Sequence, residues 1–155
     1  MSNTTVKGKE VILKRTPMVL FNMFSDLSLL VHNVPEEYGG KITADKDSIH
    51  IEYKGINMGI VVERREPFSL VVLKDDGKSF FEFTLSFFME PVGLDSTLFH
   101  IELVAELNFM MKMMVGSKLQ EMVDSLTDQI EKAVNSAAAG QPMDFSDIKS
   151  SVNFS

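Results

Sequence analysis

The sequence has no cysteine among its 155 residues, so it can form neither a disulfide framework nor a thiolate nucleophile. It also has no run of about 18 apolar residues, and we therefore expect no membrane-spanning helix. The N-terminal segment, residues 1–11, contains no apolar stretch of the kind found in a secretory signal. These absences predict a cytoplasmic protein.

Positive charge is scarce: the net charge is -7, and the 15 Lys and Arg residues form no cluster. Because a phosphate backbone repels such a chain, we expect no nucleic-acid partner. Nucleotide-binding glycine loops, a G-x-S-x-G turn and an H-x-x-x-H pair are missing as well. The sequence therefore predicts no cofactor, no metal site and no catalytic residue.

Alternating apolar and polar residues are what the chain does have. Short segments with turn residues between them are typical of antiparallel strands. Six follow one another at 41–45, 48–54, 56–66, 68–75, 79–90 and 97–107, and a seventh precedes them at 6–15.

Three helices complete the pattern. Thr16 and Pro17 suit the cap and first position of a short helix at 17–24, and a second is expected at 27–33, before Pro35. A long helix is expected from 109 to 134, and its length of about 39 Å matches the longest strands. We expect one domain over residues 1–134 and a flexible tail over 135–155.

The order strand, two short helices, six strands and one long helix resembles the helix-grip superfamily, over roughly residues 5–134. This superfamily (SRPBCC) includes START lipid-transfer domains, the birch-pollen allergen and polyketide cyclase-like proteins. The segment LNFMMKMMVGSKLQEMVDSL, residues 107–126, resembles the last helix of bacterial members. The resemblance implies an α+β fold, with a seven-stranded curved antiparallel sheet (β-α-α-β6-α) around the C-terminal helix and a cavity between them.

Strand alternation predicts which side chains face the helix. Phe83 and Phe87 share one face of their strand, and Ile101 and Leu103 share one face of the next. On the long helix, an apolar stripe at about 100° per residue includes Met111, Val115, Leu119, Met122 and Leu126. We predict that the ligand-binding residues are Phe24, Tyr53, Met58, Ile60, Arg64, Phe83, Leu85, Phe87, Ile101, Leu103, Met111, Met114, Val115, Lys118, Leu119 and Met122.

The methionines at the start of this helix point in two directions. Met111 and Met114 are expected to face the sheet, as packed core or as a pliable cavity wall. A thioether metal site is disfavoured because Met110 and Met113 lie on the other side. Together with Phe109 they predict an exposed apolar surface, and a homodimer could form through it.

Three functions remain open from the sequence. The first is a non-enzymatic carrier of a small hydrophobic or amphipathic molecule, because the predicted inner face has few polar groups. The second is a cyclase- or hydrolase-like enzyme that uses Tyr53, Arg64 or Lys118. Each of two residues could instead have a purely structural role. The stem of Lys118 could lie on the core while its ammonium reaches water, and Arg64 could form an ion pair with a neighbouring glutamate. The third is a protein-interaction module whose core is filled by its own side chains.

Overall fold

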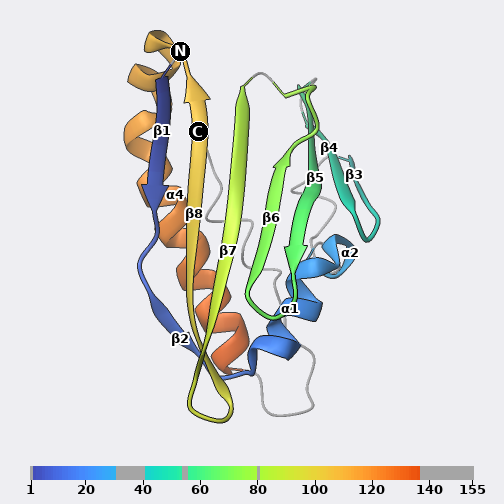
Figure 1. The fold of residues 1–155 in the computed structure, drawn as a ribbon. Coiled ribbons are helices and arrows are strands. Elements are labelled where there is room, and N and C mark those ends of the chain that lie inside the picture. Colours follow the sequence, from blue (N-terminus) through green and yellow to red (C-terminus); the bar gives the residue numbers. More distant parts are fainter. Residues whose placement is uncertain (1, 31–40, 54–55, 80, 137–155) are drawn as a thin grey trace.

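The computed structural model describes residues 2–30, 41–53, 56–79 and 81–136, and within them it contains one curved antiparallel sheet and a long C-terminal helix (Figure 1). The hydrogen-bonded order of the strands is β1-β8-β7-β6-β5-β4-β3, and β2 also pairs with β8. The predicted antiparallel meander is confirmed. Its strands are β1 (Ser2–Lys7), β2 (Val11–Leu13), β3 (Lys41–Ala44), β4 (Ser48–Tyr53), β5 (Ile56–Glu66), β6 (Leu70–Asp75), β7 (Glu82–Val92) and β8 (Ser96–Leu107).

The predicted N-terminal strand is divided in two, which gives eight strands in place of the seven expected. Both β1 and β2 pair with β8, and the interruption lies at residues 8–10. The amide of Gly8 donates a hydrogen bond to the carbonyl of Ile101 at 2.7 Å. A Cβ on Gly8 would lie 2.8 Å from Cγ1 of Val123, so glycine allows the last helix to approach the strand closely here.

The short helices begin at the predicted residues. In α1 (Pro17–Ser25), the side chain of Thr16 accepts a hydrogen bond from the Val19 amide, and proline occupies the first turn. The next helix, α2 (Leu27–Leu30), is described as far as residue 30, and the remainder of the predicted segment 27–33 lies outside the described residues.

The long helix is α4 (Phe109–Ser136). The side chain of Asn108 accepts a hydrogen bond from the Met111 amide at 2.8 Å and caps the first turn. The helix continues two residues beyond its predicted end at Val134, so Asn135 belongs to the folded domain. Most of the predicted tail, residues 137–155, lies outside the described residues.

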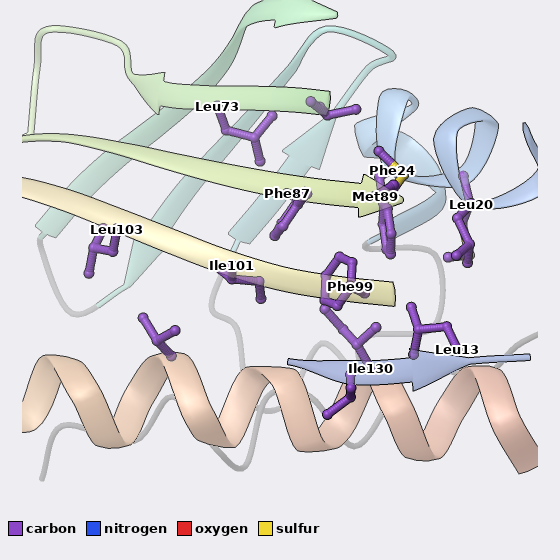
Figure 2. Close-up of a cluster of buried hydrophobic side chains, with 14 of the residues drawn as sticks. Leu13, Leu20, Phe24, Leu73, Phe87, Met89, Phe99, Ile101, Leu103 and Ile130 are labelled. Carbon is purple, nitrogen blue, oxygen red and sulfur yellow. The ribbon is translucent and has the colours of Figure 1, made fainter. Parts of the chain in front are cut away.

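The predicted alternation of strands β7 and β8 is confirmed. Every second residue of β8, from Thr97 to Leu107, is buried. Phe24 of α1 packs against Phe87 and Phe99, with ring centroids 5.2 and 5.3 Å away. Figure 2 shows these rings among the buried aliphatic side chains between the sheet, α1 and α4. The hydrophobic core therefore lies on the helix-bearing face of the sheet.

A bulge in β5 changes the predicted alternation. The register with β6 shifts between Val62 and Arg64, so Arg64 pairs with Val72 and Arg65 pairs with Val71. Val71 is fully buried in the core, whereas Arg64 is exposed. The prediction that Arg64 shares the inner face with Ile60 and Val62 is thus wrong, because one extra residue turns the strand over.

Candidate functional site

The predicted ligand-binding residues fall into three groups, and the first group fills the core. Phe24 and Ile101 have no accessible surface, and the others retain at most 4%. Side chains packed this tightly leave no space for a ligand. We call this group the filled core: Phe24, Phe87, Ile101, Leu103 and Leu119.

The second group keeps part of its apolar surface accessible. These residues come from β5, from the first half of β7 and from α4, and all have the inward orientation that the sequence predicts. Further partly buried side chains of the same face are Ile42, Ile51 and Leu126. We call the predicted members the accessible inner surface: Met58, Ile60, Phe83, Leu85, Met111, Val115 and Met122.

The two groups differ most clearly along β7. Phe87 and Met89 lie toward the end of β7 that α1 covers, and both are buried. Phe83 and Leu85 lie in the first half of β7 and stay partly exposed, although their partners on β8, Ala105 and Leu103, are buried. At the end of the sheet where α4 begins, the inner face is therefore buried on β8 and partly accessible on β7 and β5.

Part of the inner face stays accessible because α4 packs along only one edge of the sheet. The helix lies against β8, β1 and β2. Its buried face is centred on Leu119, Val123, Thr127, Ile130 and Val134. The predicted stripe is thus partly wrong: Met122 and Leu126 lie at the edge of the buried face rather than at its centre.

Polar contacts hold α4 to the N-terminal strands. Lys9 forms an ion pair with Asp128, and that hydrogen bond raises the pKa of Lys9. The Gln120 side chain donates to the carbonyl of Lys7 at 3.1 Å. Asn135 accepts from the Lys14 amide at 2.7 Å and donates to the carbonyl of Ile12. These bonds all lie on one side of the helix, and Met111, Val115 and Met122 lie on another.

The third group faces solvent, which corrects the predictions for Met114 and Arg64. Met114 is 67% exposed because it lies beyond the edge of the apolar stripe. Lys118 is also exposed, which agrees with the alternative that its ammonium group reaches water. Arg64 lies on the outer face, where its Nε is 3.1 Å from Oε2 of Glu66. It thus forms the ion pair with a neighbouring glutamate that was the alternative to a role in ligand binding. The side chain of Tyr53 lies outside the described residues.

Arg65 takes the inward position instead, and sequence reasoning missed it. Its Nη2 donates to the carbonyl of Ser25 at 2.8 Å and to Oδ1 of Asp47 at 2.6 Å. A weaker bond reaches the carbonyl of Lys46 at 3.4 Å. The guanidinium thus joins the end of α1 to the β3–β4 turn. Only the bulge places it there, and a strict two-residue alternation does not reveal a bulge.

Two hollows lie on the outer face of the sheet and were also not predicted. One, of about 510 Å³, is lined by residues that include Asp75, Glu82 and Glu106. The other, of about 360 Å³, includes Phe88 and His100, whose rings stack 4.7 Å apart. Nε2 of His100 lies 2.9 Å from Oε2 of Glu102, so this histidine has the outward orientation that the sequence predicts.

Among the residues that the structure describes, no three His, Asp or Glu side chains gather in a geometry suited to a metal ion. No helix in this part of the chain is long and apolar enough to cross a membrane.

The surface at the start of α4 is exposed, as predicted. Phe109 retains 80% of its accessible area, and Met110 and Met113 retain 71% each. Four large apolar side chains, with Met114 included, thus face solvent within six residues.

Comparison with known proteins supports the fold. No family model matches the chain, and no curated protein matches it. Among solved structures, truncated norcoclaurine synthase from Thalictrum flavum aligns with a TM-score of 0.61 at 11% identity, over 88% of this chain and 96% of that one. A START superfamily protein from Mycobacterium smegmatis aligns with a TM-score of 0.56 at 17% identity, over 85% and 97% of the two chains. Together with the curved sheet and the long C-terminal helix, these two neighbours show that this chain has the helix-grip fold.

Proposed function

We propose that the protein is a non-enzymatic carrier that binds one small hydrophobic or amphipathic molecule between α4 and the sheet. The observation that carries the proposal is the accessible inner surface. Its side chains have the orientation of core residues, yet they stay partly exposed. An apolar ligand would bury this area and gain about 25 cal/mol per Å². Such a site needs few polar groups, and Arg64, one of those predicted for it, turns outward.

Structural neighbours give the proposal its context. The fold is shared with a START superfamily protein, and norcoclaurine synthase has been solved in complex with dopamine and hydroxybenzaldehyde. A small organic ligand is therefore compatible with this fold. We further propose that the carrier works in the cytoplasm, since a chain without cysteine gains nothing from an oxidising compartment.

The two alternative functions have less support. An enzyme that uses Arg64 would need that side chain at the ligand, and Arg64 lies on the outer face. Lys118 lies about 20° from Met111 around α4, but it is exposed to solvent rather than enclosed by the inner face. A fully filled interaction module would bury Phe83, Met111 and Met122, which remain partly accessible. A homodimer through Phe109, Met110 and Met113 is compatible with the carrier, and sedimentation velocity over a range of concentrations would detect it.

Titration with a fluorescent dansyl fatty acid tests the carrier proposal. Phe83→Glu and Met111→Glu each place a carboxylate on the accessible inner surface, and each should weaken binding by at least about tenfold. Leu94→Glu is the matched control, because Leu94 is 99% exposed in the β7–β8 turn. Circular dichroism confirms that each variant is folded. Equal affinity in all three folded variants would refute the site.

A further inference from the structure

We propose that the beginning of α4 docks on an anionic lipid bilayer. The docking surface is the α4 patch, which we define as Phe109, Met110, Met113 and Met114. This inference rests on the proposed carrier function. A carrier of apolar molecules must collect them from a phase that dissolves them, and a bilayer is such a phase.

The patch is contiguous on the helix. At about 100° per residue, its four side chains span about 140° of the helix circumference. Met110 and Met114 face away from Leu119 and Val123, which pack on the sheet, whereas Phe109 lies about 40° from Val123 around the helix and is exposed in its first turn. Large apolar side chains grouped in this way, with lysines beside them, are typical of a helix that lies in the interface of a membrane.

Charge favours an anionic partner. The protein as a whole carries -7, yet the first twelve residues of α4 have only two charged side chains, Lys112 and Lys118. Both lysines are exposed. No acidic residue lies in the first turn, so the positive end of the helix dipole is not offset by a carboxylate. Each lysine near an anionic surface strengthens binding by about fivefold.

The nearest acidic residues of the sheet do not oppose this contact. Glu82 and Glu106 are paired across β7 and β8 and belong to the outer face. The helix covers the inner face, so the sheet lies between these carboxylates and the patch. A contact between two copies through the patch would instead bring Lys112 and Lys118 of one copy close to the same lysines of the other.

The patch also continues into the proposed binding site. Met111 and Val115, both on the accessible inner surface, belong to the same two turns of α4 as the patch. At this end of the sheet the inner face stays partly accessible on β5 and β7, whereas it is buried on β8. A bilayer at the α4 patch would thus meet the proposed site at its accessible end.

Co-sedimentation with vesicles tests the inference. We expect the protein to bind vesicles of phosphatidylglycerol and phosphatidylcholine, to bind pure phosphatidylcholine much more weakly, and to be released by high salt. The double variant Met110→Glu/Met113→Glu should lose at least about tenfold in partitioning. Val92→Glu/Leu94→Glu is the control, because it adds the same two charges to exposed apolar residues at the opposite end of β8.

The outcomes separate the two proposals. Failure of the wild-type protein to bind anionic vesicles, or equal binding by the double variant, would overturn the docking. A dimer that the double variant abolishes, without vesicle binding, would identify a second copy as the occupant. In either case, unchanged dansyl fatty acid affinity in the double variant leaves the carrier proposal intact, whereas Phe83→Glu tests the carrier independently.

Discussion

Gly8, between β1 and β2, and Val123 of α4 lie in direct contact where the helix meets the edge of the sheet. A Cβ on Gly8 would stand 2.8 Å from Cγ1 of Val123 and 3.2 Å from the carbonyl oxygen of Ile101. The missing side chain lets Val123 become fully buried. This contact holds α4 against the N-terminal strands, and it thereby leaves Met111 and Met122 partly accessible on the adjacent side.

Gly8→Ala should therefore destabilise the protein by about 1–3 kcal/mol, because the helix or the strand must move to admit the methyl group. Gly116→Ala is a suitable comparison within α4. Its Cβ would approach only the flexible Lys112 side chain, at 3.3 Å, and should stabilise the helix by up to about 1 kcal/mol. Urea denaturation gives both values. A neutral effect of Gly8→Ala would contradict the close approach.

Arg65→Ala should cost about 1.5–3 kcal/mol of unfolding free energy, because it removes charge-assisted bonds to Ser25 and Asp47. The adjacent variant Arg64→Ala loses only an exposed ion pair with Glu66 and should change stability by less than about 0.5 kcal/mol. Thermal or urea unfolding of the pair checks the β5 bulge directly. The reverse ranking would mean that Arg64 is the inward residue.

A larger side chain on the accessible inner surface should block the ligand without unfolding the protein. Met122→Trp adds volume at a partly exposed position, so we expect at least about tenfold weaker dansyl fatty acid binding and a stability change below about 1 kcal/mol. Met114→Trp is the control, because it makes the same substitution outside the inner face. The affinity of this variant for dansyl fatty acid should stay near that of the wild type. Equal affinities of the two variants would argue against a ligand beside Met122.

The stability of the protein should depend on the protonation of Glu82. This residue lies directly opposite Glu106 in the β7–β8 register. A hydrogen bond to Glu106 and repulsion from Glu106 and Asp75 raise the pKa of Glu82. A raised folded-state pKa favours the folded state at low pH, and this contribution is lost as the pH rises through that value.

Glu82→Gln should therefore raise the melting temperature at neutral pH, and the gain should shrink as the pH falls toward the ordinary carboxyl pKa. Glu90→Gln, on the same strand, is the control, because Glu90 lies opposite Leu98 rather than opposite another carboxylate. Melting curves from neutral to mildly acidic pH provide the comparison. If Glu82→Gln raised the melting temperature at acidic pH but not at neutral pH, the result would contradict a raised pKa of Glu82.

The sequence was sufficient to predict the sheet and the inner face of most strands. The alternation in residues 97–107 is strict, and a shift of one residue would bury His100 and Glu102, so only one register is favourable. The cap residue Thr16 likewise marks the start of α1 through a local hydrogen bond.

Other features depend on contacts between distant segments. The β5 bulge is stabilised by bonds from Arg65 to Ser25 and Asp47, which are 40 and 18 residues away in sequence. The rotation of α4 is set by Gly8 and by the polar contacts of Gln120 and Asn135 with the N-terminal strands. Helical periodicity predicts an apolar stripe, but it does not show which part of that stripe packs against the sheet.

Native mass spectrometry of the protein isolated from the cells that make it tests the carrier proposal most directly. Spectra recorded before and after mild organic extraction would be compared, with the protein mass of 17.4 kDa as the reference. We predict a reproducible excess mass that is lost on extraction and that is absent from Phe83→Glu but present in Leu94→Glu. An unliganded mass in the wild type, together with no binding of added dansyl fatty acid, would contradict the carrier function.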